Sequence, residues 1–272
     1  MHISFIGGGN MARAIIGGLK INGFDMQNIT VIEPTAEKRT QLIADFDVQT
    51  AVEYSSVPSE NMIDEVILLA VKPQQLHDVC QQIAPLLTSQ LVISIAAGVR
   101  SADISRWLNA HSSIVRVMPN TPAQIQAGVS ALFALPQVKT AQREQAAKIL
   151  SAVGLILWLD DESKMDAITA ISGSGPAYVF YLIEALSDAA VALGLPVDHA
   201  RLLALETFAG ASMLAKHSTE DVKTLRAQVT SKGGTTEQGI LALEAANIKN
   251  AMLQAAMAAA EKSRALGDTL AQ

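Results

Sequence analysis

Three consecutive glycines follow an apolar segment at the start of the chain. The segment and the turn after it read Ile3-Ser4-Phe5-Ile6-Gly7-Gly8-Gly9-Asn10-Met11-Ala12. Gly7 permits a sharp turn, Gly9 has no side chain to block a pyrophosphate, and Ala12 lets the following helix pack closely on the strand. The helix expected over Met11–Ile21 would direct its free N–H groups toward the phosphates. Because a strand, a turn and a helix occur in this order, residues Ile6 to Ala12 predict a dinucleotide site.

A carboxylate follows this turn at the spacing of a ribose-binding acid. Glu33 ends a second apolar run, Ile29–Glu33, about twenty residues or slightly more beyond the glycines. A carboxylate there accepts a hydrogen bond from the adenosine ribose 2′-hydroxyl, which favours NAD. Thr35, Lys38 and Arg39 follow closely and could bind a 2′-phosphate if Glu33 turned away. The sequence therefore leaves NADPH and NADH both open.

A second glycine-rich segment, Thr230–Gln238, leads into a later helix. Its core, Gly233-Gly234-Thr235-Thr236, puts flexible backbone and two hydroxyls at a helix N-terminus, where free N–H groups and the helix dipole favour an anion such as a carboxylate. The alternative is a well-capped helix start, with Thr235 and Gln238 spaced as a capping box. Both interpretations stay open, because capping explains the threonines but not the paired glycines.

Two further segments could approach a ligand. Ser172-Gly173-Ser174-Gly175-Pro176 is predicted to be a small-residue turn with Ser174 as the N-cap of a helix over Pro176–Leu193, and close packing is its favoured role. Lys72 stands at the carboxyl end of an expected strand and could support a cofactor. A solvated lysine before the turn at Pro73 is an equal alternative.

The remaining reactive side chains form no catalytic pattern. The five histidines have no metal-binding spacing, so no metal is expected. Cys80 is the only cysteine, which excludes an intrachain disulfide, and a buried structural role is favoured for it. The sequence contains no Gly-x-Ser-x-Gly elbow, which disfavours a hydrolase.

Short apolar runs alternate with amphipathic stretches over the first half of the chain, which is typical of a parallel sheet with crossover helices. Beyond Glu162 the strand signal stops, and helices are expected over Asp198–Lys216 and Ile248–Ala265, with another opened by Ser218-Thr219-Glu220-Asp221. We therefore predict a dinucleotide-binding domain over residues 1–161 and a helical domain over residues 162–272. The expected strands are His2–Ile6, Ile29–Glu33, Val66–Val71, Leu91–Ile95, Ile114–Val117, Val129–Leu135 and Leu155–Leu159.

Composition narrows the choice of partners and compartment. The 272 residues carry a net charge of -6, which offers no electrostatic footprint for nucleic acid or an anionic membrane. No apolar run approaches a membrane span, no secretory signal is expected, and a reducing cytoplasm fits the single cysteine. The helix over Pro176–Leu193 is apolar around most of its circumference, which predicts a homodimer through the C-terminal half.

Six segments span nearly the whole chain in this order: Phe5 to Ala12, Ala70 to Pro73, Ser94 to Val99, Met118 to Pro122, Ser172 to Tyr178 and Gly233 to Thr236. Taken together, they closely resemble the pyrroline-5-carboxylate reductase family. The resemblance implies reduction of 1-pyrroline-5-carboxylate to L-proline with NADPH or NADH, the last step of proline synthesis. It also implies an α/β fold with a Rossmann-type parallel sheet followed by an all-helical dimerisation domain, and a homodimer that could assemble further.

The same resemblance implies roles for individual residues. Ala70, Val71, Lys72 and Pro73, with Ala96 and Ala97, would lie along the cofactor toward the nicotinamide. Gly233, Gly234, Thr235 and Thr236 would bind the substrate carboxylate, the Thr236 hydroxyl would reach the ring nitrogen as the catalytic group, and Ser174 would belong to the substrate site. Two positions depart from the family pattern, in which proline is common in place of Lys232, and serine or threonine in place of Glu33.

Two other functions fit part of the chain. A related dehydrogenase acting on a β-hydroxy acid would use a catalytic lysine in the helical half, but Lys164, Lys216, Lys223 and Lys232 occur in no equivalent motif. A redox-sensing nucleotide-binding module would explain the first glycine motif. It gives no reason for the second.

Overall fold

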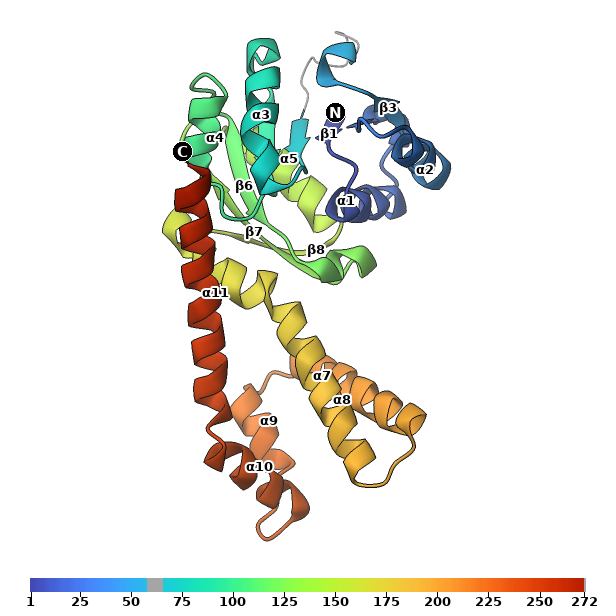
Figure 1. Ribbon diagram of the computed structural model, residues 1–272, viewed down its shortest axis with the longest axis vertical. Coiled ribbons are helices and arrows are strands. Elements are labelled where there is room, and N and C mark those ends of the chain that lie inside the picture. Colours follow the sequence, from blue (N-terminus) through green and yellow to red (C-terminus); the bar gives the residue numbers. More distant parts are fainter. Residues whose placement is uncertain (58–65, 272) are drawn as a thin grey trace. The chain divides into compact units, whose positions relative to one another are not determined.

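The computed structural model describes residues 1–57 and 66–271. Contacts divide the chain into two compact units (Figure 1). The first unit comprises Met1–Ser174 together with Ala258–Gln272, and the second comprises Gly175–Met257.

The first unit contains an eight-stranded sheet in the order β3-β2-β1-β4-β5-β6-β7-β8. All neighbours pair in parallel except β6 and β7, because the connection Pro119–Ala127 is too short for the crossover of about a dozen residues that a parallel pair needs. From β1 the chain adds β2 and then β3 on one side of the sheet, and it adds β4 to β8 on the other side. The strand order therefore reverses between β1 and β4. The strands are β1 (Ile3–Ile6), β2 (Ile29–Ile32), β3 (Gln49–Ala51), β4 (Val66–Leu69), β5 (Leu91–Ser94), β6 (Ile114–Met118), β7 (Gly128–Ala134) and β8 (Gly154–Trp158).

Seven of these eight strands are predicted by the sequence, with ends that differ by one or two residues. The prediction missed β3, whose residues Gln49, Thr50 and Ala51 lie half exposed at the edge of the sheet and show no apolar alternation. The sheet is a Rossmann-like sheet, as expected, with one antiparallel pair added near its other edge.

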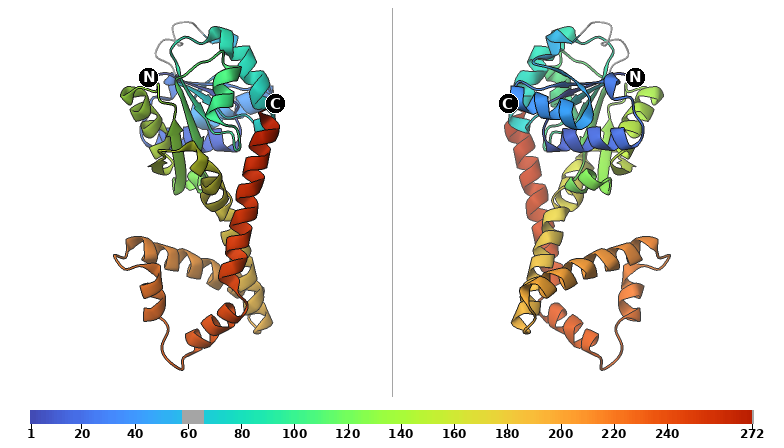
Figure 2. Two further views of the ribbon diagram at one scale, coloured as in Figure 1. Left: turned by 90° about the vertical axis from the view of Figure 1, so that its left-hand side faces the viewer. Right: turned by 90° about the vertical axis from the view of Figure 1, so that its right-hand side faces the viewer.

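Helices cover both faces of this sheet (Figure 2). On one face α1 (Asn10–Ile21), α2 (Ala36–Phe46) and α5 (Thr140–Ser151) pack on Ile3, on Phe5 and on the side chains of the other strands that point to the same face. On the other face α3 (Pro73–Ile83) and α4 (Ser101–Trp107) pack on Ile6 and its equivalents. Strand residues alternate between the two cores, as the two-residue period of a strand requires.

Short 3-10 helices complete the described connections of the first unit. They are η1 (Met26–Asn28), η2 (Tyr54–Ser56), η4 (Ala84–Leu86), η5 (Thr121–Ile125) and η6 (Glu162–Lys164).

The segment after β8 corrects one prediction. Ser174 is not an N-cap, because the helix has already begun with α6 (Met165–Ile168) and continues through a π-helical stretch, Thr169–Gly173. The Ser174 backbone is helical, with φ −83° and ψ −24°, and its N–H donates to the Thr169 carbonyl at 2.8 Å. A Cβ at Gly173 would overlap the terminal carbon of Met118, so close packing explains this glycine.

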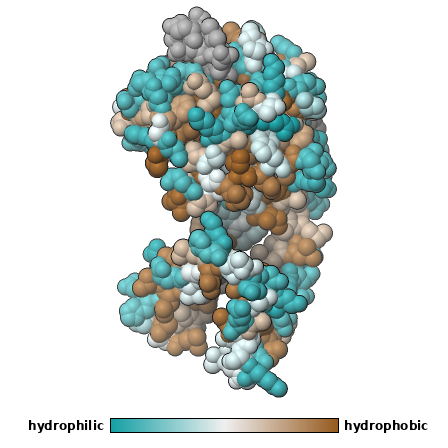
Figure 3. Space-filling view, turned by 180° about the vertical axis from the view of Figure 1, so that it is seen from behind, coloured by the Kyte–Doolittle hydropathy of each residue, from teal (hydrophilic) through white to brown (hydrophobic). Residues whose placement is uncertain are grey.

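The second unit consists of helices. They are α7 (Gly175–Ala192), α8 (Val197–His217), α9 (Val222–Gln228), α10 (Thr235–Ala245) and the first part of α11 (Ile248–Leu270). Among the residues of this unit only Ala200 and Ala204 are buried. Figure 3 shows apolar side chains spread among polar ones on the surface of these helices.

Two predicted helix starts differ from the structure. Asp221, rather than Ser218, caps α9, because its carboxylate accepts the Thr224 N–H at 2.7 Å, while the Ser218 hydroxyl accepts only the N–H of Glu220. The predicted capping box of Thr235 and Gln238 does not form, and Gly234 is the N-cap of α10 without a side-chain hydrogen bond. The last helix, predicted to end at Ala265, continues to Leu270, and Gly267 in this added part packs against Gly98.

Candidate functional site

The glycine turn between β1 and α1 has the geometry that a phosphate requires. Gly7 has φ +101°, and a Cβ there would lie 2.9 Å from the Ala70 carbonyl oxygen. A Cβ at Gly9, the N-cap of α1, would meet no atom within 4 Å. Within the described chain, the N–H groups of Asn10, Met11 and Ala12 in the first turn of α1 have no acceptor. The turn is therefore an open cradle with free donors at a helix N-terminus.

A hollow of about 680 Å³ opens beside this turn, at the carboxyl ends of β1, β2 and β4. Its volume lies in the range of small-molecule and cofactor sites. It is also the place where ligands of open α/β sheets bind, next to the reversal of strand order. The hollow brings together these predicted residues: Ile6, Gly7, Gly8, Gly9, Glu33, Thr35, Ala70, Val71 and Lys72.

One wall of the hollow was not predicted. It is formed by Val52–Ser55, directly after β3, and by residues of α3 that include Gln75 and Val79. The sequence does not indicate the role of Val52–Ser55, because β3, which positions this segment, shows no apolar alternation. The second part follows from the amphipathic pattern of α3 once Lys72 is placed at the rim.

The other predicted cofactor residues lie outside the lining of the hollow. Ala12 is fully buried between α1 and the sheet, where it permits the expected close packing. Asn10 and Met11 belong to the first turn of α1, and Pro73 is the first residue of α3. Ala96 is buried in the second core and Ala97 is half-buried, both just beyond β5.

Glu33 lines this hollow, with only 5% of its surface exposed. Its Oε2 accepts the Gly8 N–H at 3.2 Å, and its Oε1 accepts the Thr35 N–H at 3.1 Å. Burial by itself would raise the pKa of Glu33. The hydrogen bonds from Thr35 and Gly8 and the charge of Lys38 outweigh it, and they leave the pKa below its usual value. The hollow therefore holds a fixed negative charge.

The two cations near Glu33 differ in their availability. The Lys38 ammonium lies 3.9 Å from Glu33 Oε1, and its side chain is mostly exposed on the wall of the hollow. Arg39 is already hydrogen-bonded to the backbone, because its Nη1 donates to the carbonyl oxygens of Glu33 and Pro34 at 2.8 Å each. The arginine thus stabilises the turn after β2, and Lys38 alone faces the Glu33 carboxylate.

Lys72 is exposed on the rim of the same hollow, where it is the N-cap of α3. Its carbonyl oxygen accepts the Gln75 N–H at 2.9 Å. Within the described chain its ammonium has no partner. The position suits contact with a bound phosphate or ribose.

The second glycine-rich loop belongs to the second unit. Gly233 has φ +75°, and its N–H donates to Glu237 Oε2 at 2.7 Å. The Gly234 N–H donates to the Ser231 carbonyl at 3.0 Å. Thr235 and Thr236 are exposed in the first turn of α10, and in the described chain their N–H groups have no acceptor. The free donors of this loop are therefore the threonine N–H groups.

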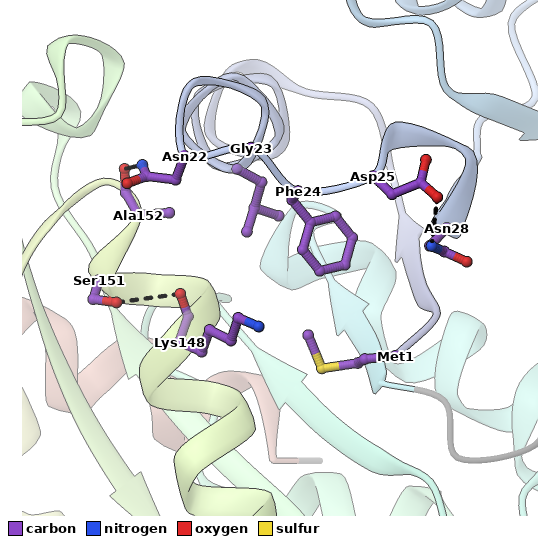
Figure 4. Close-up of a pocket in the computed structure, with 10 residues that line it drawn as sticks. Met1, Asn22, Gly23, Phe24, Asp25, Asn28, Lys148, Ser151 and Ala152 are labelled. Atoms are coloured by element: carbon purple, nitrogen blue, oxygen red, sulfur yellow. Dashed lines mark hydrogen bonds between the residues drawn. The ribbon is translucent and has the colours of Figure 1, made fainter.

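Another hollow, of about 460 Å³, lies beside Met1 at the amino end of β1 (Figure 4). Its two asparagines are already engaged: Asn28 Nδ2 donates to Asp25 Oδ2 at 3.0 Å, and Asn22 Nδ2 donates to the Gly18 carbonyl at 2.8 Å. It lies away from the carboxyl ends of the strands, where the chemistry of this fold takes place. We assign it no part in the site.

Three observations concern residues outside the site. Cys80 is fully buried on α3, and burial raises the pKa of its thiol to about 12, which confirms a structural residue. The described residues contain no group of three or more His, Cys, Asp or Glu that could hold a metal ion. None of the helices in the described ranges is long and apolar enough to cross a bilayer.

Two family models match separate parts of the chain. The family described as pyrroline-5-carboxylate reductase dimerisation matches residues 162–266, and the family described as NADP oxidoreductase, coenzyme F420-dependent, matches residues 2–98. A pyrroline-5-carboxylate reductase of Pseudomonas aeruginosa is 44% identical over 100% of this chain and 98% of its own. The chain belongs to the pyrroline-5-carboxylate reductase family. The pea enzyme of this name, from Pisum sativum, is 36% identical over 97% of this chain and 95% of its own.

Solved structures of pyrroline-5-carboxylate reductases share the whole fold. The structure from Coxiella burnetii has a TM-score of 0.90 and 41% identity, and it covers 97% of this chain and 98% of its own. The structure from Plasmodium falciparum, which has NADP bound, has a TM-score of 0.86 and 31% identity over 98% of both chains. The region that matches the dimerisation family includes the Gly233–Thr236 loop.

Proposed function

We propose that this chain reduces 1-pyrroline-5-carboxylate to L-proline with a hydride from NADH or NADPH, as the last step of proline biosynthesis. The observation that carries the proposal is the full-length match to pyrroline-5-carboxylate reductases, with 44% identity over 100% of the chain. The open glycine cradle and its hollow support it, because they supply the phosphate and ribose sites that such a reaction needs.

The cofactor would be held by the first unit. The N–H groups at the start of α1 would bind its pyrophosphate, Glu33 and Lys38 would face its adenosine ribose, and Lys72 would contact it from the rim of the hollow. Ala96 and Ala97 would lie along its nicotinamide end. When bound, the reduced nicotinamide supplies the hydride.

The substrate would be held by the second glycine-rich loop. Gly233, Gly234, Thr235 and Thr236 would form its carboxylate site, with the free N–H groups of the two threonines as donors. The protonated ring nitrogen makes C5 electrophilic, so addition of hydride there converts the C=N bond to a C–N single bond and leaves the proton on nitrogen. The Thr236 hydroxyl would orient that nitrogen, and Ser174 would contribute to the substrate site. Alignment and exclusion of water then matter more than a strong acid or base.

We infer that NADH is used in preference to NADPH. The 2′-phosphate of NADPH would meet the fixed negative charge of Glu33, whose two oxygens are held by backbone N–H groups. Lys38 compensates only in part, because its side chain is mostly exposed and its ammonium lies 3.9 Å from the carboxylate. Arg39 is already engaged by two carbonyl groups.

The assembly we propose is a homodimer that pairs the helices of residues 162–272, and a higher oligomer can be built from such dimers. The match of residues 162–266 to a dimerisation family supports this. So does the near absence of buried side chains among the described helices of Gly175–Met257.

The activity is tested by the loss of reduced-nicotinamide absorbance when purified protein meets 1-pyrroline-5-carboxylate. Thr236→Ala should lower kcat/KM by about 1 to 3 kcal/mol, the scale of losing a partner for a buried polar group. Thr219→Ala, which removes an exposed hydroxyl between α8 and α9, is the matched control and should leave kcat/KM unchanged.

Other outcomes would redirect the assignment. Turnover of a β-hydroxy acid in place of the imine would favour a related dehydrogenase, and cofactor binding without any turnover would favour a nucleotide-sensing module. An unchanged kcat/KM in Thr236→Ala would remove Thr236 from the site while leaving the reaction in place.

A further inference from the structure

We propose that Glu237 is a positioning residue for the substrate loop, a role that rests on the proposed function. Its carboxylate lies in the first turn of α10 and accepts the N–H of Gly233, in the loop before the helix, at 2.7 Å. Glu237 would thereby hold Gly233 and Gly234 in the conformation that presents the Thr235 and Thr236 N–H groups to the substrate carboxylate.

The loop has little else to hold Gly233 in place. Gly233 is exposed, its φ is +75°, and a Cβ there would meet no atom within 4 Å. Gly234 is better fixed, because its N–H donates to the Ser231 carbonyl and a Cβ there would lie 2.5 Å from Ser231 Oγ. A glycine with open space around it loses more conformational freedom on ordering than any other residue. The hydrogen bond to Glu237 is the contact that opposes this loss.

The existing hydrogen bonds of the loop determine which backbone N–H groups remain for a ligand. Both glycine N–H groups are already used, by Glu237 and by Ser231. In the described chain the N–H groups of Thr235, Thr236 and Glu237 have no acceptor, as expected for the first turn of a helix. Glu237 therefore does not compete for the donors that face the substrate.

The test is steady-state kinetics of purified variants with 1-pyrroline-5-carboxylate as the varied substrate and saturating NADH. Glu237→Ala should raise KM for the imino acid about tenfold, with kcat changed less than threefold, because a charge-assisted hydrogen bond that orders the binding loop is lost. Glu237→Gln keeps an oxygen acceptor at the same reach and should restore KM to within about twofold of the wild-type value. The dissociation constant of NADH, measured by fluorescence, should be the same in all three proteins.

Glu244→Ala is the matched control, since Glu244 is an exposed carboxylate at the other end of α10. It should change neither KM nor kcat. The urea-unfolding midpoint of each variant separates a loop effect from loss of fold, because the Gln and Ala variants should unfold at nearly the same concentration.

Each contrary result has a distinct meaning. An unchanged KM in Glu237→Ala would overturn the positioning role. A lowered KM would overturn it as well, because it would mean that Glu237 competes with the substrate for the Gly233 N–H. A wild-type protein without imine reductase activity would instead refute the proposed function.

Discussion

Glu33 shows how a single residue can serve both the fold and the choice of cofactor. Its carboxylate fixes the glycine turn through Gly8 and the start of α2 through Thr35. The same carboxylate lines the hollow in which an adenosine ribose would lie. Ordinary carboxyl groups are already ionised above about pH 6, and the pKa of Glu33 is lower than usual. The charge of Glu33 is therefore constant between pH 6 and 8.

Removing that charge should change the cofactor preference. Glu33→Gln keeps the size of the side chain, and the ratio of kcat/KM for NADPH to that for NADH should rise about tenfold or more, since about 1.4 kcal/mol of repulsion corresponds to a factor of ten. Wild type should favour NADH, with a ratio that does not change through Glu33 between pH 6 and 8. Glu37→Gln, which removes an exposed carboxylate in the first turn of α2, should leave the ratio alone. A wild-type preference for NADPH would contradict this account.

The sequence predicted these residues better than it predicted their hydrogen bonds. Gly7, Gly9 and Glu33 follow from type and spacing, because a phosphate turn and a ribose acid need those residues at those intervals. The start of α10 does not follow in this way. Thr235 and Gln238 have the spacing of a capping box, but Gly234 takes the N-cap position and the longer side chain of Glu237 reaches back to Gly233 instead. Residue spacing alone does not determine which of several polar side chains accepts a given N–H, because this depends on the three-dimensional arrangement of the loop.

At the scale of elements, the alternation of side chains predicts strands well and helix junctions poorly. The residues of β1, β4 and β5 divide between two cores, so their apolar runs carry a strong signal. β3 carries none because it is a short edge strand. The stretch from Met165 to Gly175 misled the prediction because its small residues are typical of a turn, whereas here they let a π-helical segment pack against Met118.

Two adjacent glycines in α1 give a matched test of element packing. A Cβ at Gly17 would touch only Phe46 at 3.5 Å, whereas a Cβ at Gly18 would lie 2.5 Å from the Ala152 carbonyl oxygen. Gly17→Ala should therefore raise the free energy of unfolding by up to about 1 kcal/mol, the propensity gain of alanine in a helix. Gly18→Ala should lower it by about 1 to 3 kcal/mol, because backbone atoms at the junction of α5 and β8 must move.

Urea unfolding followed by circular dichroism measures both changes. Effects of the same sign and size in the two variants would show that helix propensity outweighs the contact with Ala152. That result would also mean that α1 can shift relative to the Ala152 backbone without loss of stability.

At the scale of the whole molecule, the helices of the second unit expose many large apolar side chains. Phe180, Leu193, Leu202 and Met213 are among its exposed large side chains, on α7, α8 and the turn between them. Large apolar side chains exposed together on neighbouring helices point to an interaction surface. The sequence predicted an apolar α7, but not that α8 would expose apolar side chains as well, because their burial depends on a second copy of the chain.

A charge placed on this surface should separate the dimer without unfolding the sheet. Phe180 is 64% exposed on α7, and Phe180→Glu would put a carboxylate in the middle of the proposed interface, where burial of an unpaired charge is costly. Light scattering after size exclusion should give a dimer or a multiple of it for wild type and monomer for Phe180→Glu at micromolar concentration, with loss of reductase activity. Ile21→Glu, at a side chain 70% exposed on α1, is the control and should stay assembled and active. A wild-type protein that is monomeric at this concentration would contradict the proposed assembly, because the apolar side chains of α7 would then remain exposed to water without a partner subunit.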